Sequence, residues 1–470
     1  MPVACDEFRF IRIPEFLAAA WLHPGRIVRY GDCVGCCSCA ESGADEKTEV
    51  ARGTCRQRKE MWGIKIVIAN SLYSPNIIGG AEISTQILAE TLRDVAEVHV
   101  LTTGGQKSSD GVTTYLVNGV KVHRVPYNNL YWIGAGEGKT TMQKVGRRLI
   151  DLYNPVQIRT VAKLIAELKP DLVHTQNLSG FGAGIWSAFH KAGVPIVHTL
   201  RDYSLISPVS SPISNPALSS VYKTTSLGFS RRVSAVVGIS SHILNRHTGS
   251  GLFPNAAKLV IPNVVDGDIA RVPKDFTSRP LRIGYFGRIE AEKGVRELVE
   301  AVRLLPGKVV GTLYVCGEGS LKEELEEQCK SDNRIVFTGK VLPAEARELM
   351  GYVDATVVPS IWEEPFGRVI IESYQAGTPV YAAAVGGIPD VVVDSSHLFL
   401  PGSAEAIREK LAGHYAMPPE WKSELQRQCL EHCRSFTKES LLERHLELYR
   451  SLLSPAGGAA VAGTAAYTGR

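Results

Sequence analysis

The chain has 470 residues, of which 44% are hydrophobic and 21% are charged, as in soluble proteins with two or three globular domains. Its 52 basic and 48 acidic side chains leave a net charge of +4, which argues against a general nucleic-acid-binding protein. No run approaches the roughly 20 apolar residues of a membrane-spanning helix. The short apolar run Phe16–Leu22 follows acidic residues, which is atypical of a signal peptide. We therefore expect a cytoplasmic protein.

Residues 1–60 form an N-terminal extension that lacks a sustained hydrophobic period and is expected to be disordered. Six of the ten cysteines lie in it: Cys5, Cys33, Cys36, Cys37, Cys39 and Cys55. Only one clean Cys-x2-Cys unit exists there, whereas structural zinc sites usually combine two, so we expect adventitious thiols and no metal. One hypothesis is that the working protein begins near Met61. Cys316, Cys329, Cys429 and Cys433 are expected to be reduced thiols, buried or solvated.

Residues 61–265 alternate between strand and helix patterns, which predicts a Rossmann-like N-terminal domain. Strands are expected at 64–69, 97–103, 172–175, 194–200, 235–239 and 258–261. Asn118-Gly119 marks the turn of a hairpin over 114–126. Gly79-Gly80 precedes a helix whose apolar face is expected to contain Ile83, Ile87, Leu88 and Leu92. A basic helical region spans 140–168 and is interrupted at Pro155.

A linker over 266–280 leads to a second Rossmann-like domain, predicted over 281–435. Its strands are expected at 281–286, 311–316, 334–338, 355–359 and 379–383. We expect a C-terminal helix over 436–453 that packs back on the N-terminal domain, followed by a flexible tail over 454–470. The carboxyl ends of the parallel strands of two such domains face each other across a cleft.

The sequence Glu364-Pro-Phe-Gly-Arg-Val-Ile-Ile-Glu372 joins the strand at 355–359 to a helix expected to start at Pro365. Glu364 then lies at the mouth of the cleft, and Glu372 lies about 12 Å further along the helix. The amides of Phe366, Gly367 and Arg368 lie between them at a helix N-terminus, which suits an anion. Sugar hydroxyls, a diphosphate and ribose hydroxyls have the same order in a nucleotide sugar. Taken alone, the motif is equally consistent with a structural role, in which Glu364 caps the helix and Glu372 is solvated on its surface.

Two cations follow the first strand of the same domain. Gly287-Arg288 comes directly after the strand, and Lys293-Gly294 opens the next helix. A cation is disfavoured at a helix N-terminus unless an anion binds there, so these charges point to a diphosphate leaving group. Gly386-Gly387-Ile-Pro-Asp390 is another glycine turn at a strand end, where backbone amides can approach a ligand.

In this order, the motifs resemble those of glycosyltransferase family 4, which is retaining, has the two-domain GT-B fold and uses nucleotide sugars. The resemblance runs from about Ile64 to about residue 450 and is strongest over 281–394. It includes Gly317-Glu-Gly319 and Phe337-Thr-Gly339. It implies a metal-independent hexosyltransferase without a cofactor, acting on a glycan, lipid-linked or small-molecule acceptor. It also implies that the domain over 61–265 takes the acceptor and the domain over 281–435 takes the nucleotide sugar. The alternative is a catalytically inactive nucleotide-sugar-binding or scaffold protein of the same fold.

The resemblance also implies roles for single residues. Glu364 and His198 would contact the sugar, Glu372 the ribose, and Arg288 and Lys293 the diphosphate. Further donor-binding positions are Gly80, Gly287, Gly339, Val341, Phe366, Gly367, Arg368, Gly386 and Gly387. His174 resembles an acceptor-side position. Departures are Tyr203-Ser-Leu-Ile-Ser-Pro208, where relatives continue with aromatic, proline and cysteine residues, and Asp390, where a glutamate is usual.

His198 lies four residues before Asp202 and is open to a second interpretation. It could act as a general base oriented by the carboxylate of Asp202, which would suit an inverting enzyme. We favour the sugar contact, with the leaving diphosphate accepting the acceptor's proton. A buried structural histidine is the third reading.

The basic region around Lys144, Arg147, Arg148, Arg159 and Lys163 is the last feature of interest. It either forms a solvated helix face, which we favour, or contacts an anionic membrane peripherally at its inner face. A dehydrogenase is disfavoured because no Gly-x-Gly-x-x-Gly follows the first strand. A glycosyl phosphorylase is disfavoured because nothing indicates a pyridoxal-binding module.

Overall fold

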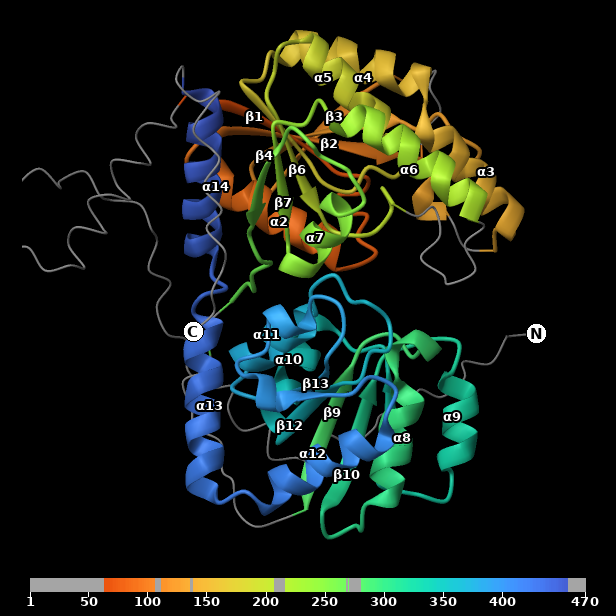
Figure 1. Cartoon of the computed structure of the whole chain (residues 1–470), viewed down its shortest axis with the longest axis vertical. Helices are drawn as coiled ribbons and strands as arrows, with labels where there is room; N and C mark the ends of the chain where they lie inside the picture. Colours follow the sequence, from red (N-terminus) through yellow and green to blue (C-terminus); the bar gives the residue numbers. More distant parts are fainter. Residues whose placement is uncertain are drawn as a thin grey trace, which may run out of the picture. The chain divides into compact units, whose positions relative to one another are not determined.

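The computed structural model describes residues 63–105, 111–135, 138–206, 216–267, 269 and 280–454. The predicted extension over 1–60 with its six cysteines lies outside the described residues, as do the tail beyond Ser454 and most of the linker. Figure 1 shows the described part as two sheets, each flanked by helices.

The first sheet has eight strands in the order β3-β4-β2-β1-β5-β6-β7-β8. They are β1 Lys65–Ala69, β2 Glu97–Gly104, β3 Thr113–Val117, β4 Val120–Pro126, β5 Leu172–Thr175, β6 Ile196–Leu200, β7 Ala235–Gly238 and β8 Ala257–Val260. All neighbours pair in parallel except β3 and β4, which form the predicted antiparallel hairpin. Asn118 and Gly119 have φ values of 47° and 82°, as a tight hairpin turn requires.

Helices connect these parallel strands. They are α2 Gly80–Arg93, η3 Ile133–Ala135, α3 Thr141–Leu152, α4 Pro155–Leu168, η4 Ala183–Ile185, α5 Trp186–Lys191, α6 Pro216–Ser230 and α7 Ser241–Thr248. The basic region divides into α3 and α4 before Pro155, as predicted, because Asn154 caps α4 and proline suits a first helical position.

The second sheet is wholly parallel and has the order β11-β10-β9-β12-β13-β14. Its strands are β9 Leu281–Phe286, β10 Val310–Cys316, β11 Ile335–Gly339, β12 Ala355–Val358, β13 Val380–Ala383 and β14 Leu398–Phe399. Its helices are η5 Ala291–Lys293, α8 Val295–Leu304, α9 Lys322–Cys329, α10 Pro343–Tyr352, α11 Arg368–Gln375, η6 Ile388–Asp390, η7 Ser395–His397, α12 Ala404–Ala416 and α13 Pro419–Cys433. The predicted pair of parallel α/β domains is therefore confirmed.

The last helix, α14 Lys438–Leu453, packs against α2 of the first domain. Leu441, Leu442 and Leu446 join the buried cluster under the first sheet. The Tyr449 hydroxyl lies 2.6 Å from Nδ1 of His174 on β5. In Figure 1, α13 lies beside the second sheet and α14 beside the first.

Two sequence interpretations need correction. Ile83 is 36% exposed, and the inner face of α2 is completed by Ser84 and Thr85 instead. Thr85 tolerates burial because its hydroxyl donates to Ala81 O and to Oε1 of Gln176. Arg147 is not part of a solvated or membrane-facing surface, since it is 6% exposed and pairs with buried Asp151 at 2.9 Å.

None of the helices in the described ranges combines the length and apolar character that crossing a membrane requires. The four cysteines of the described part are buried free thiols, as expected.

We expect Leu446→Ala to lower the free energy of unfolding by about 2–5 kcal/mol, because it opens a cavity where α14 meets the first sheet. Urea denaturation measures this loss. Glu447→Ala, at an exposed position on the same helix, is the control and should change stability by less than about 0.5 kcal/mol. Equal effects of the two substitutions would show that α14 does not depend on its buried face.

Candidate functional site

An ion pair joins two loops at the carboxyl ends of neighbouring strands in the second sheet. Lys293 ends the short helix η5 after β9, and Glu364 lies in the loop after β12. The Lys293 ammonium donates to Oε1 of Glu364, with side chains only 19% and 16% exposed. Ser360 Oγ donates to the same oxygen at 2.9 Å. The anion expected near Lys293 is thus supplied by the protein's own carboxylate.

Gly294 allows this approach. It is the N-cap of α8 with a φ of 68°, and a Cβ atom there would lie 1.9 Å from the Pro359 carbonyl oxygen. Only glycine combines that left-handed conformation with such close contact between the two loops.

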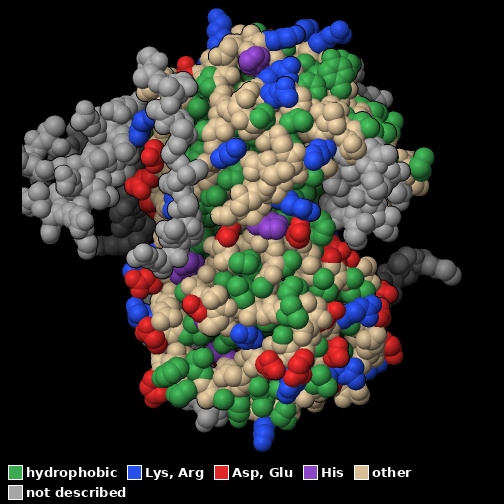
Figure 2. All heavy atoms as spheres, in the orientation of Figure 1, with side chains coloured by type: hydrophobic (Ala, Val, Ile, Leu, Met, Phe, Trp, Pro, Cys, Tyr) green, Lys and Arg blue, Asp and Glu red, His purple; other side chains and the backbone are tan. Residues whose placement is uncertain are grey.

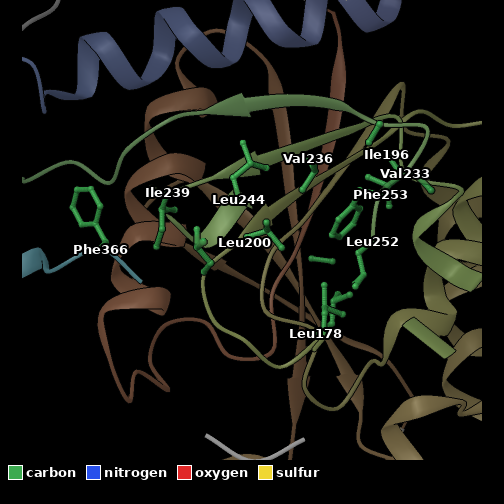
Figure 3. Packing of buried hydrophobic residues seen from close by; sticks show 14 of the residues in the cluster. Leu178, Ile196, Leu200, Val233, Val236, Ile239, Leu244, Leu252, Phe253 and Phe366 are labelled. Atoms are coloured by element: carbon green, nitrogen blue, oxygen red, sulfur yellow. The ribbon is translucent and has the colours of Figure 1, made fainter. Parts of the chain in front are cut away.

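The helix after Glu364 begins later than predicted. α11 starts at Arg368, with Gly367 at φ 91° as its N-cap, so Pro365 is not its first residue. Phe366 is the reason, because it is 3% exposed and packs in a cluster with Leu200 and Ile239 of the first domain (Figure 3). Because Phe366 is directed into this cluster, residues 365–367 are not helical and α11 begins only at Arg368.

Gly386 and Gly387 support the Glu364 loop. A Cβ atom on Gly386 would lie 2.4 Å from the carbonyl oxygen of Glu364, and the Gly387 N–H donates to that oxygen at 2.7 Å. The Gly387 amide is therefore engaged within the protein, and the pair fixes the backbone that presents Glu364.

Arg288 and Gly287 follow β9 as expected. The Arg288 side chain is 66% exposed and lies 3.4 Å from Oε1 of Glu292. The Tyr285 hydroxyl donates to the Arg288 carbonyl oxygen at 2.5 Å, which fixes the backbone. The guanidinium is held only by an exposed ion pair, so it can turn toward a ligand at little cost.

Arg368 connects the two domains. Its Nε donates to Oε1 of Glu372 at 2.7 Å, and its Nη1 donates to Ser84 Oγ on α2 at 3.0 Å. A Cβ atom on Gly80 would lie 3.4 Å from Cδ of Arg368. The structure thus brings together the predicted positions Gly80, Arg368 and Glu372.

Gly339 and Val341 lie at the end of β11. The Gly339 carbonyl oxygen accepts from the Gly317 N–H at 2.9 Å, and its φ is 70°. Val341 packs partly buried against the small cluster that contains Phe286 and Met350. This turn is ordered by the core, and its predicted place near a nucleobase stays a prediction.

His198 lies inside the first domain. It is 3% exposed, and its Nδ1 is 2.9 Å from Thr175 Oγ1. Its ring lies 5.0 Å from that of Trp186 and 5.7 Å from that of Phe253. Burial lowers the pKa of His198 to about 3. The ring of His198 therefore packs in the core of the first domain, and its predicted contact with the sugar stays a prediction.

His174 is also enclosed. Its ring nitrogens lie 2.6 Å from the Tyr449 hydroxyl and 2.7 Å from Thr199 Oγ1, which leaves neither nitrogen for an acceptor. Burial holds the pKa of His174 well below its ordinary value.

Arg201, which the sequence reasoning missed, follows His198 by three residues. It is the first residue after β6, so it lies at a strand end. It donates to Oε1 of Gln176 and, at 2.6 Å, to Oδ1 of Asn263. Arg288 and Glu364 were predicted because they follow parallel strands, whose carboxyl ends line the cleft. The same argument applies to Arg201.

Helix α7 holds the second domain's loops. Ser240 Oγ donates to the Pro365 carbonyl oxygen at 2.7 Å, and the Ser241 N–H donates to Oδ2 of Asp390 at 2.5 Å. A carboxylate at the N-terminus of α7 is favourable for the helix dipole. Asp390 therefore has a definite role in joining the domains.

Within the described ranges, no three His, Cys, Asp or Glu side chains are grouped as a metal site would require.

The fold places the protein in a known class. The HepE protein of Anabaena in complex with UDP matches with a TM-score of 0.62 over 83% of this chain and 100% of that chain, at 19% identity. Sucrose-phosphate synthase of Thermosynechococcus elongatus matches with a TM-score of 0.65 over 83% and 99% of the two chains, at 19% identity. Both likenesses concern the fold, and they confirm the predicted GT-B architecture.

Sequence comparisons then give the family. The family described as Glycosyltransferase Family 4 matches residues 78–268, and Glycosyl transferases group 1 matches residues 268–431. An uncharacterized 42.6 kDa protein in the cps region of Klebsiella pneumoniae is 32% identical over 336 residues, which is 70% of this chain and 87% of that protein. A D-inositol 3-phosphate glycosyltransferase of Mycobacteroides abscessus is 29% identical over 309 residues, or 59% and 65% of the two chains. The chain belongs to glycosyltransferase family 4, as its motifs predicted.

We expect Gly294→Ala to destabilise the second domain by about 2–4 kcal/mol, because it combines a strained φ with a clash against Pro359. The control is Gly351→Ala in α10, where a Cβ atom meets nothing within 4 Å. That substitution should be neutral or slightly stabilising. Denaturant unfolding of both variants measures the difference, and an equally small effect at Gly294 would contradict the close packing.

The buried histidines predict acid sensitivity. Burial lowers the pKa of His198 to about 3 and that of His445 to about 4. The unfolded chain binds these protons from about pH 6.5 downward. Stability is therefore full above that pH and is lost as the pH falls from 6.5 toward the folded-state values. Each such histidine lowers the free energy of unfolding by at most roughly 1.4 kcal/mol for each pH unit of acidification.

Urea unfolding of wild type and His198→Gln at pH 5 to 7.5 tests this. The variant should be less stable at neutral pH but lose less stability on acidification. His190→Gln, at an exposed position, is the control and should show the same dependence of stability on pH as wild type. Identical slopes in wild type and His198→Gln would contradict the assignment of a neutral core histidine.

Proposed function

We propose that the protein is a retaining, metal-independent transferase that moves a hexose-type sugar from a nucleoside diphosphate to an acceptor hydroxyl. The observation that carries the proposal is the pairing of Lys293 with Glu364 between the loops after two neighbouring strands, together with the exposed cation Arg288 after the first of them. Both cations are suited to a diphosphate, and the carboxylate to sugar hydroxyls. Phe366, Gly367 and Arg368 add the amides at the start of α11.

The ion pair gives Lys293 a defined role in the reaction. When a donor binds, its diphosphate competes with Glu364 for the ammonium group. The freed carboxylate can then accept hydrogen bonds from the sugar. Lys293 and Arg288 stabilise the negative charge that grows on the diphosphate as the glycosidic bond breaks, which replaces a metal ion in this role.

The environment of His198 supports retention over inversion. An inverting reaction needs a general base near the acceptor, but the imidazole of His198 is enclosed by Trp186 and Phe253. Asp202 does not orient it, since that carboxylate accepts from Asn177 and from the Ser204 N–H instead. A same-face reaction, in which the leaving phosphate takes the acceptor's proton, needs no such base.

The acceptor is a glycan, a lipid-linked sugar or a small molecule with a free hydroxyl. A lipid-linked acceptor would suit peripheral membrane contact through the first domain. Met142 and Tyr153 around α3 are 81% and 60% exposed. Figure 2 shows hydrophobic and basic side chains together over the end of the molecule where α3, α4 and α5 lie in Figure 1. Such mixed faces favour anionic lipid surfaces.

A donor panel tests the reaction class. We expect one of UDP-, GDP- and ADP-glucose to be hydrolysed slowly, with EDTA leaving the rate unchanged. Proton NMR before mutarotation should show the donor's anomeric configuration in the released sugar. An inverted product would overturn retention, and a strict metal requirement would overturn the proposed role of the cations. Tight donor binding without turnover would instead favour a nucleotide-sugar-binding protein.

Replacing Glu364 tests the sugar contact. We expect Glu364→Gln to lower the rate of donor hydrolysis by roughly 100-fold, because the sugar loses its positioning group. The adjacent Glu363 is the matched control, since it lies 3.7 Å from His242 and 3.6 Å from Arg246 of the first domain. Glu363→Gln should retain the rate within a few fold. Equal losses for both variants would remove the special role of Glu364.

A further inference from the structure

Arg201 is a partly buried cation whose direct hydrogen-bond partners among the described residues are neutral. It donates to the side-chain oxygens of Gln176 and Asn263. Gln176 is held in turn by Thr85, which donates to the same oxygen at 2.7 Å. This arrangement fixes the guanidinium without neutralising it. Buried cations are normally paired with an anion, so the position calls for one.

The charges around Arg201 increase the need for an anion. Burial, followed by repulsion from Arg368, lowers the pKa of Arg201 to about 9. Glu82 is the one nearby carboxylate that opposes this shift, and its Oε2 already accepts from the Gly79 N–H at 2.8 Å. Arg201 and Ser84 line the same small cavity, and Arg368 of the second domain donates to Ser84 Oγ at 3.0 Å, so the two arginines approach each other without a shared carboxylate.

The surroundings of this arginine pair suit a phosphate group. Arg368 lies at the first position of α11 and against Gly80, the first residue of the 14-residue helix α2. The N-termini of two helices thus meet where the two guanidinium groups approach. Helix N-termini attract phosphate through free N–H groups and the helix dipole, and arginine binds phosphate oxygens in a bidentate manner.

We propose that Arg201 is a catalytic residue of the first domain that contacts the sugar-linked phosphate of the donor. This inference rests on the proposed function and extends it. As the bond between the sugar C1 and the phosphate oxygen breaks, its electron pair passes to that oxygen, where Arg201 stabilises the new charge. The acceptor oxygen bonds to C1, and its proton goes to the same phosphate. Arg201 and Arg368 then hold the leaving group from opposite domains.

The sugar-linked phosphate is what distinguishes a nucleoside diphosphate from a monophosphate, so the two make a matched pair of probes. Calorimetry would compare UDP with UMP, or the GDP and ADP pairs if the donor panel selects those bases. We expect Arg201→Gln to weaken diphosphate affinity at least tenfold and to leave monophosphate affinity unchanged. Arg201→Lys keeps the charge and should recover part of the loss. Arg159→Gln, at an exposed position of the same domain, should bind both probes like wild type.

Two results would overturn the inference. One is wild-type diphosphate affinity in a folded Arg201→Gln variant, with folding checked by circular dichroism. The other is a loss confined to UDP-glucuronic acid, which would assign Arg201 to a sugar carboxylate instead of a phosphate. If wild type binds none of the diphosphates, the proposed function itself fails, and this inference falls with it. The two failures are therefore distinguishable.

Discussion

The ion pair between Lys293 and Glu364 is the constraint on which the second domain's site depends. It brings together the loops after β9 and β12, two neighbouring strands of a parallel sheet. Each loop is held at this distance by glycine, because Gly294 contacts Pro359 and Gly386 contacts the Glu364 backbone. The pair also satisfies both charges, and its two side chains are only 19% and 16% exposed. In the proposed reaction, a diphosphate replaces Glu364 as the partner of Lys293 without leaving the ammonium unpaired.

The first domain meets this site through a few specific contacts. Arg368 reaches Ser84 on α2, and α7 binds the loops around Pro365 and Asp390. Burial of Phe366 in a cluster shared by both domains adds apolar contact to these hydrogen bonds. The short segment 364–368, which we propose contacts the donor, therefore also carries contacts between the domains.

Much of the fold was predictable from the sequence because buried parallel strands read as continuous apolar runs. The hairpin at Asn118-Gly119 was equally clear, since few residue pairs adopt two positive φ values. The start of α11 was not predictable, because Pro365 suits a first helical position but Phe366 is drawn into a distant cluster. Tertiary packing decided this helix start, and local preference did not.

The site was partly predictable for a related reason. Residues in the loops that follow parallel strands, such as Arg288 after β9 and Glu364 after β12, lie at the carboxyl edge of the sheet. His198 lies within β6, where side chains alternate between the two faces of the sheet. The sequence did not show where the strand ends, and therefore which residue first leaves the sheet. The family resemblance drew attention to the histidine, whereas the strand end belongs to Arg201, three residues later.

The central claim is that Glu364 competes with the donor's diphosphate for Lys293. The affinity of Glu364→Gln for the nucleoside diphosphate, measured by calorimetry beside Lys293→Met, tests it most directly. We predict that Lys293→Met binds at least tenfold more weakly than wild type, whereas Glu364→Gln binds as tightly or more tightly, because its Lys293 is already free. A Glu364→Gln variant that loses diphosphate affinity as Lys293→Met does would contradict the account.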